Sequence, residues 1–145
     1  MGRDNARTPM QWDASEHAGF TTGEPWIPVN ANHTEINAQA AVADPDSVFH
    51  HYRRLIELRH SEPAVAHGDF TMLLPDDERV YAFTRRRGDV ELFVLGNFSG
   101  DAAPVPEALE WADAELVLGN CPPPGTPAEH GTLEPWEARV YRRRG

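Results

Sequence analysis

The sequence contains no lysine, a single cysteine and no long apolar run. All 13 basic residues are arginine, against 23 acidic residues, and the formal net charge is -10. A chain this acidic repels a phosphate backbone as a whole, so we expect no nucleic-acid partner. No apolar run approaches the roughly 20 residues that span a bilayer, and no signal-like segment opens the chain. We therefore expect no membrane partner either.

The single cysteine, Cys121, cannot form an internal disulfide, which is typical of a reducing compartment and predicts a cytoplasmic protein. Its neighbours, Asn120 and Pro122, offer nothing that would activate a thiol, so we interpret Cys121 as structural. Among the histidines, His50 and His51 are adjacent on an expected helix and point in different directions, whereas a metal pair favours a spacing of three or four. We expect no metal and no cofactor.

A chain of 145 residues holds one domain, or a small domain with an appended segment. Its first 45 residues are rich in Asn, Thr, Pro and Gly and show no apolar periodicity. They nevertheless contain large apolar side chains at Met10, Trp12, Phe20 and Trp26, which argue against disorder. This segment is predicted to be a long, ordered loop, and loops of that length are usually functional.

A helix is predicted over about 45–60. Asp44 and Pro45 suit the cap and the first helical position, and the sequence Ser-Glu-Pro at 61–63 ends the pattern. Apolar residues recur at spacings of three and four, which places them on one broad face: Val48, Phe49, Tyr52, Leu55 and Ile56. The face is broad enough that we expect it to have a second partner besides the segment that follows.

After residue 68 the pattern changes to that of strands, predicted over 69–74, 79–84, 90–98, 115–118 and 138–142. Tight turns separate the first three, which predicts an antiparallel meander. Five or more short strands indicate an all-β sandwich or an open barrel. The arginine runs at 85–87 and 142–144 lie next to a turn or the chain end, where solvated charge is expected.

Carboxylates in the long loop could in principle form an acid–base pair. Asp4 and Asp13 are candidates, as are Glu24 and Glu35. In a chain with 23 carboxylates such pairs arise by chance, and nothing in the sequence indicates an environment that would tune either pair. We therefore expect no independent hydrolytic activity.

The opening stretch RDNARTPMQWD and its continuation AGFTTGEPWIPVN resemble the α-glucosidases of glycoside hydrolase family 13, especially the oligo-1,6-glucosidase and short-chain α-glucosidase group. The similarity continues through DPDSVFHHYRRLIELR, VYAFTR, LFVLGNFS and LEPWEARVYR. It therefore extends from Arg3 to Arg143, nearly the whole chain.

This resemblance implies the C-terminal fragment of a retaining α-glucosidase, because such enzymes carry a catalytic (β/α)8 barrel before an antiparallel β-domain. Residues 1–62 would be the end of the barrel, namely the loop after its eighth strand and its eighth helix. Residues 63–145 would be the C-terminal β-sandwich, so the fold is expected to be mainly β. A barrel needs about 250 residues, and the catalytic carboxylates of the family lie on earlier strands. The fragment is expected to be inactive and to stabilise the missing barrel.

The resemblance also assigns roles within the opening stretch. Arg3 would line the pocket for the non-reducing terminal glucose of an α-linked gluco-oligosaccharide and donate hydrogen bonds to its hydroxyls. The alternative is that Arg3 and Arg7 only fix the loop through ion pairs with Asp4 or Asp13. A loop-structuring role is expected for four residues: Asp4, Arg7, Gln11 and Trp12. The residues that decide between α-1,4 and α-1,6 linkages lie outside the sequence.

A second hypothesis is a stand-alone β-sandwich that binds carbohydrate on an aromatic platform formed by Trp111 or Trp136. Trp136 lies in a turn before the last predicted strand, where ordinary packing is the simpler interpretation. We also expect the broad helix face to support a homodimer if no barrel covers it.

Overall fold

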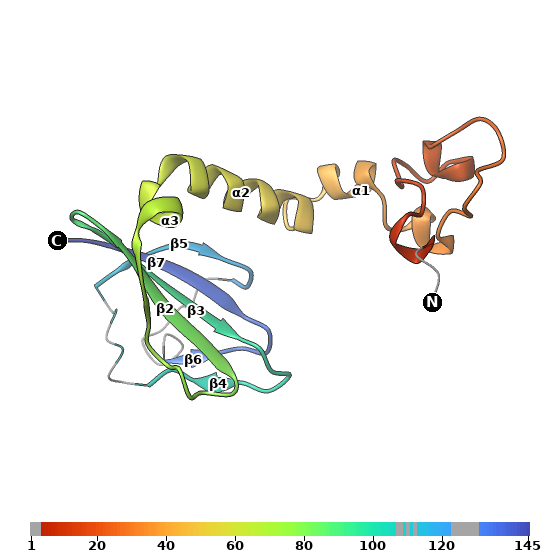
Figure 1. Cartoon of the computed structure of the whole chain (residues 1–145). Helices are drawn as coiled ribbons and strands as arrows, with labels where there is room; N and C mark the ends of the chain where they lie inside the picture. The colour runs from red at the N-terminus through yellow and green to blue at the C-terminus, as the bar shows by residue number, and fades with distance from the viewer. Residues whose placement is uncertain (1–3, 107–108, 110, 112, 123–130) are drawn as a thin grey trace. The chain divides into compact units, whose positions relative to one another are not determined.

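The structure is a computed structural model that describes residues 4–106, 109, 111, 113–122 and 131–145 (Figure 1). The chain divides into two compact units, Met1–Arg53 and Arg54–Gly145. The division falls inside a helix, whereas the sequence predicted a domain boundary after residue 62. Where the domains divide in the complete enzyme therefore stays a prediction, and each unit is considered by itself below.

The first unit consists of short helical turns joined by irregular backbone. Three 3-10 turns, η1 (Asp4–Ala6), η2 (Glu16–Gly19) and η3 (Ala31–Thr34), precede helix α1 (Ala38–Ala43). Helix α1 was not predicted from the sequence. It begins there because the Asn37 side chain caps it, accepting a hydrogen bond of 2.8 Å from the N–H of Ala40.

Helix α2 spans Val48–Ser61, so its predicted start at about residue 45 is wrong. Asp44 does not cap α2, because it terminates α1 by donating its backbone N–H to the Ala40 carbonyl at 3.1 Å. Its carboxylate accepts the N–H of Asp46 at 3.0 Å, and its carbonyl accepts the N–H of Ser47 at 3.1 Å. These bonds stabilise a turn, and the next helix therefore begins only at Val48.

The second unit begins within α2 and continues into helix α3 (Pro63–His67). Pro63 occupies the first turn of α3, where its missing N–H costs nothing. The Glu62 side chain caps this helix by accepting the Ala64 N–H at 3.3 Å. None of the helices in the described part of the chain is long and apolar enough to cross a membrane.

Two antiparallel sheets follow, which confirms the mainly β fold (Figure 1). The larger sheet has the order β1-β2-β3-β7-β5, with strands β1 (Asp69–Met72), β2 (Val80–Arg87), β3 (Val90–Asn97), β7 (Ala138–Arg144) and β5 (Glu115–Gly119). Strands β4 (Ala103–Pro104) and β6 (Thr132–Leu133) form the smaller sheet, and the sequence did not predict either. Each has only two residues, too few to show an alternating pattern.

The arginine runs at 85–87 and 142–144 form the ends of strands β2 and β7, beside a turn and beside the chain end as expected. They extend the ladder because acidic residues on neighbouring strands face them. Arg143 pairs with Glu91 at 3.0 Å, and Arg142 with Glu115 at 2.7 Å. Arg142 and Arg143 are therefore paired with carboxylates across the strands and are not isolated charges.

The main core lies between the two sheets. Its buried side chains come from β2, β3 and β7 on one side and from β4 and β6 on the other: Val80, Ala82, Phe93, Leu95, Ala103, Leu133 and Tyr141. A smaller cluster lies where α3 packs on the larger sheet, with Ala64 against Val90 and Leu92. The larger sheet is thus covered by the small sheet on one face and by α3 on part of the other.

Candidate functional site

The opening stretch lies in the N-terminal loop, which we define as residues 4–37. Arg3, the predicted sugar ligand, lies outside the described residues. Asp4 opens the turn η1, and its carbonyl accepts the N–H of Arg7 at 3.0 Å. Both side chains are exposed. Within the described part of the chain, no ion pair joins Arg7 to Asp4 or Asp13, so the arrangement offers no support for ion-pair anchoring by Arg7.

Gln11 connects parts of the N-terminal loop that are far apart in the sequence. Its side-chain nitrogen donates to the carbonyl of Ile36 and to Oδ1 of Asn32, the latter at 3.3 Å. Its side-chain oxygen accepts from Nδ2 of Asn30 at 3.1 Å, and its backbone carbonyl accepts from the N–H of Ala38 at 2.8 Å. One amide side chain thereby holds the opening stretch against the start of α1.

Two asparagines that the sequence analysis did not single out complete this network. Asn30 donates to Thr8 Oγ1 at 3.3 Å as well as to Gln11. Asn37 is buried and donates to the His33 carbonyl at 2.8 Å while capping α1. The Asn-Ala step before a run of alanines was a readable N-cap signal for Asn37. The hydrogen bonds of Asn30 join residues about twenty positions apart in the sequence. No local sequence pattern could have predicted them.

A tight reversal follows Trp12. The N–H groups of Trp12 and Asp13 both donate to the Ala18 carbonyl, at 2.9 and 3.3 Å. This reversal needs left-handed backbone at His17, Ala18 and Gly19, with φ of 54°, 57° and 64°. Ala18 is fully buried at its centre, whereas the Trp12 ring is half exposed. The backbone of Trp12 therefore shapes the loop while its ring remains available for contact.

Asp13 is held as a carboxylate. Hydrogen bonds from the hydroxyl and the N–H of Ser15 lower the pKa of Asp13 below its ordinary value. A carboxylate in that state cannot donate a proton near neutral pH, so Asp13 is a poor general acid. The other carboxylates considered from the sequence, Glu24 and Glu35, have exposed side chains without an enclosing environment. Among the described residues of the N-terminal loop, Asp13 therefore lacks the raised pKa that a general acid of glycoside hydrolysis needs, and neither glutamate lies in the enclosed environment that produces it.

A hollow of about 260 Å³ lies inside the first unit, between the opening stretch and the segment around Trp26. Arg7, Phe20 and Trp26 contribute to its lining. Phe20 is 50% exposed and Trp26 is 97% exposed. Aromatic faces beside a guanidinium group are the kind of surface to which sugar rings and their hydroxyls bind.

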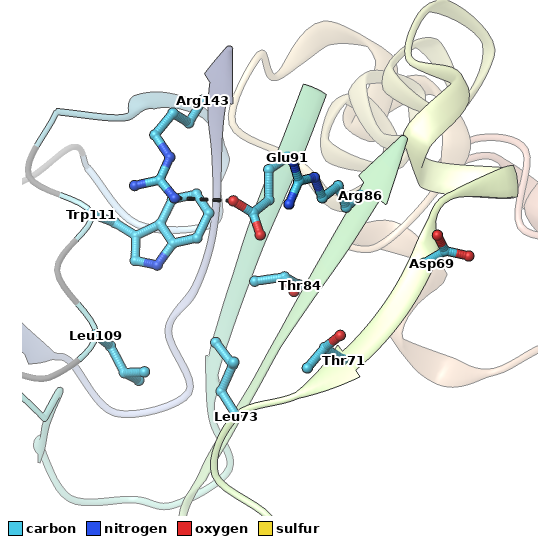
Figure 2. A pocket seen from close by; sticks show the side chains of 9 residues that line it. All are labelled: Asp69, Thr71, Leu73, Thr84, Arg86, Glu91, Leu109, Trp111 and Arg143. Carbon is cyan, nitrogen blue, oxygen red and sulfur yellow. Dashed lines mark hydrogen bonds and ion pairs between the residues drawn. The ribbon is translucent and has the colours of Figure 1, made fainter. Parts of the chain in front are cut away.

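A larger hollow of about 700 Å³ lies in the second unit, on the face of the large sheet that carries Thr71 and Thr84. Figure 2 shows Glu91 and Arg143 paired at its rim, with Trp111 beside them. Its lining combines two hydroxyls with acidic and basic side chains from neighbouring strands. Among the residues that the structure describes, no three histidine, cysteine or acidic side chains come together as a metal site.

The carbohydrate platform predicted at Trp111 is not available, because both faces of its ring are occupied. Phe93 stacks on one face with ring centroids 4.6 Å apart, and the Arg143 guanidinium lies 4.3 Å from the ring centroid. Two groups this close need opposite faces of the indole. Trp136 is 63% exposed, so its interpretation as a packed residue is wrong. It lies in a turn with φ of 59°, and none of the aromatic pairs among the described residues includes it.

The lone cysteine and the paired histidines have ordinary roles in this structure. Burial and the nearby Glu137 carboxylate raise the pKa of the Cys121 thiol, which keeps it protonated at neutral pH. His50 makes a hydrogen bond of 3.0 Å between Nε2 and the Val42 carbonyl, so its ring links the start of α2 to α1.

The alpha amylase catalytic domain is the family model that matches this chain, over residues 1–68. The chain is 48% identical over 147 residues to an oligo-1,6-glucosidase of Parageobacillus thermoglucosidasius, covering 99% of this chain and 26% of the relative. It is 44% identical over 149 residues to a trehalose-6-phosphate hydrolase of Bacillus subtilis (strain 168), covering 97% of this chain and 26% of that relative.

The fold is similar to the crystal structure of the Bacillus licheniformis trehalose-6-phosphate hydrolase. The TM-score is 0.87 at 39% identity, and the match covers 99% of this chain and 27% of that structure. The chain therefore spans about a quarter of the length of the relatives that it matches. The catalytic-domain model ends at residue 68, directly before strand β1, so the sheets follow the catalytic domain.

Proposed function

We propose that this chain, which is similar to α-glucosidases of glycoside hydrolase family 13, is the C-terminal portion of a retaining enzyme and completes an active site for short α-glucosides. In this proposal the N-terminal loop forms one wall of the substrate pocket. The β-sheets stabilise the barrel, and the catalytic carboxylates come from the barrel strands. The chain described here hydrolyses nothing by itself.

The observation that carries this proposal is the Gln11 network. Its hydrogen bonds to Asn30, Asn32 and Ile36 hold the opening stretch in one conformation without help from any sheet. Loops at the C-terminal face of a barrel build its active site. We assign the contact with the terminal glucose to Arg3, as the family resemblance implies.

A chimera tests this function. The corresponding quarter of the Parageobacillus thermoglucosidasius oligo-1,6-glucosidase is replaced by this chain, and hydrolysis of isomaltose, maltose and p-nitrophenyl α-glucoside is measured. We expect an active chimera, and because the residues that decide between α-1,6 and α-1,4 linkages lie outside this chain, its preference between the first two substrates should be that of the host enzyme. Arg3→Ala should raise KM or lower kcat/KM at least tenfold, while Glu24→Ala, another change in the same loop, should have little effect. A folded but inactive chimera would contradict the proposal.

The isolated chain provides the complementary measurement. It should show no turnover of p-nitrophenyl α-glucoside, since it lacks the carboxylate pair that the reaction requires. Turnover that follows the protein through chromatography and survives Arg3→Ala would overturn this part of the proposal. Calorimetric titration with maltose and isomaltose should likewise detect no binding; measurable binding would favour the carbohydrate-binding module instead. We place the complete enzyme in the cytoplasm, in keeping with the single cysteine of this chain.

A further inference from the structure

The hollow on the large sheet has a row of alternating charges along one end (Figure 2). The row crosses four neighbouring strands, because its members lie opposite one another in the strand register: Asp69 on β1, Arg86 on β2, Glu91 on β3 and Arg143 on β7. Acidic and basic side chains balance, so the row is neutral as a whole. We propose that this hollow binds a zwitterionic α-amino acid with an aliphatic side chain.

Glu91 and Arg143 close one half of the row. Nη2 of Arg143 lies 3.0 Å from Oε2 of Glu91. The same arginine approaches Oδ1 of Asp113 to 4.0 Å through its Nη1 atom, and its guanidinium carbon lies 4.3 Å from the Trp111 ring centroid. Trp111 in turn stacks on Phe93 of the main core. This half of the row is therefore a fixed wall of the hollow, and its arginine is already neutralised.

Asp69 and Arg86 form the open half of the row. Side chains of residues directly opposite one another on antiparallel strands begin about 5 Å apart, so these two could pair as Glu91 and Arg143 do. Among the described residues, however, neither side chain makes an ion pair or a hydrogen bond. A row that served only to stabilise the sheet would gain most from pairing along its whole length. The open half thus offers a free carboxylate beside a free guanidinium group.

Two hydroxyl groups and an apolar wall lie next to the open half. Thr71 lies opposite Thr84, and both face the hollow (Figure 2). Thr84 is only 7% exposed, yet its hydroxyl makes no hydrogen bond within the part of the chain that the structure describes. Leu73 and Leu109 also line the hollow. The order along the chain from Asp69 is therefore charge, hydroxyl and apolar side chain, at every second residue.

An α-amino acid complements this arrangement group by group. Its carboxylate accepts two parallel hydrogen bonds from the Arg86 guanidinium group. Its ammonium group donates to the Asp69 carboxylate and to the Thr71 hydroxyl, and its aliphatic side chain lies against Leu73 and Leu109. The ammonium and carboxylate groups of the ligand share one carbon atom, which suits charges carried by two directly opposite residues.

Other classes of ligand fit the hollow less well. A phosphate or a dicarboxylate would face two carboxylates, Asp69 and Glu91, and a polyamine would face two guanidinium groups. A neutral sugar would leave both free charges without an opposite charge, and it could not stack on Trp111, whose two ring faces are occupied. The volume of about 700 Å³ is ordinary for a small-molecule site, for which about 300–1,000 Å³ is typical.

Calorimetric titration of the isolated chain with leucine tests the inference. It needs no catalytic barrel, because the residues of the hollow all lie in the second unit. We expect saturable binding. Isocaproate, which is leucine without its ammonium group, and leucinamide, which lacks the carboxylate, should each bind about tenfold more weakly or less, as expected for the loss of a charge-assisted contact. Isocaproate that binds as tightly as leucine, or leucine that does not bind up to its solubility limit, would overturn the inference.

Two neighbouring arginines of β2 provide matched variants. Arg86→Gln removes the free guanidinium group and should weaken leucine binding about tenfold. Arg87→Gln makes the same change of charge one residue along the strand, where the side chain points to the opposite face of the sheet, and should leave the affinity unchanged. Thr84→Val, which preserves the shape of the side chain, should weaken binding as well. Equal effects of Arg86→Gln and Arg87→Gln would show a nonspecific effect of charge and would overturn the inference.

Saturation-transfer NMR reports how the ligand lies in the hollow. The leucine methyl protons should receive more saturation than the α proton, because they contact Leu73 and Leu109. The reverse order would contradict the proposed orientation, and maltose binding that disappears in Arg86→Gln would replace the amino-acid site by a sugar site. The inference does not depend on the proposed function: an inactive chimera refutes only the enzymatic role, and a chain that ignores leucine refutes only this site.

Discussion

Arg139 and Glu137 form a two-pronged ion pair inside the β-sandwich, with Nε to Oε1 at 2.7 Å and Nη2 to Oε2 at 2.8 Å. Their side chains are only 4% and 3% exposed. Both groups have further partners: Glu137 accepts the N–H of Glu134 at 2.7 Å, and Arg139 donates to the Thr132 carbonyl at 2.8 Å. The pair thereby joins β7 to the small sheet.

Glu137→Gln should therefore destabilise the second unit strongly. The substitution preserves shape but leaves the Arg139 guanidinium buried without its counter-charge, and breaking a buried pair in this way costs about 3–5 kcal/mol. Urea unfolding measures the change. Glu115→Gln is the matched control, because it removes the carboxylate that pairs with Arg142 at an exposed position; its cost should stay below about 1 kcal/mol. A similar decrease in the free energy of unfolding for Glu137→Gln and Glu115→Gln would contradict this account.

This pair also shows how far the sequence could predict the structure. The alternation in β2, β3 and β7 was readable because each strand is long enough to show its period. Glu137 directly precedes β7 and Arg139 lies within it, so neither their pairing nor their burial was predictable from the strand pattern. Burial there depends on β4 and β6, whose two-residue strands carry no periodic signal. Side-chain hydrogen bonds across about twenty residues, such as those of Gln11, likewise have no local pattern.

Gly19→Ala should loosen the first unit. Residue 19 has φ of +64°, and an added Cβ would lie 2.6 Å from Oδ2 of Asp13. Left-handed strain alone costs about 1–3 kcal/mol, and displacement of the Asp13 carboxylate also disturbs its bonds to Ser15. Hydrogen exchange at the Trp12 N–H, which donates to the Ala18 carbonyl, should accelerate. Gly23→Ala is the control, because nothing lies within 4 Å of its Cβ position. Unchanged exchange in Gly19→Ala would refute the role of this reversal.

Asp77 should make the second unit sensitive to acid. Hydrogen bonds from the N–H groups of Val80 and Arg79, at 2.8 and 2.9 Å, lower the pKa of Asp77. A group with a lowered folded-state pKa contributes stability above its unfolded pKa of about 3.9, and loses it as the pH falls through the folded value. Asp77→Asn should lower the urea midpoint at pH 7, with the difference from the parent chain shrinking below about pH 4. Asp76→Asn, in the same turn, should change neither the urea midpoint at pH 7 nor its dependence on pH. If Asp77→Asn lowered the urea midpoint by the same amount at every pH, this linkage would be contradicted.

The exposed face of α2 leads to the last prediction, that the isolated chain self-associates through this helix. Phe49, Tyr52 and Ile56 lie on one side of α2 and are 46%, 63% and 49% exposed. Covering such side chains is worth about 25 cal/mol per Å² of apolar surface, and a symmetric dimer would cover the same patch on both copies.

Net charge acts against this association and makes it dependent on salt. Two chains of formal charge -10 repel each other, but moderate salt screens that repulsion beyond a Debye length of about 8–10 Å. Raising the salt concentration should therefore strengthen the dimer, which light scattering can follow. Phe49→Glu should weaken it by placing a charge within the apolar contact. Arg54→Gln changes the net charge by the same amount on another side of the helix and should have little effect. A chain that stays monomeric at high salt and high protein concentration would exclude this mode of association.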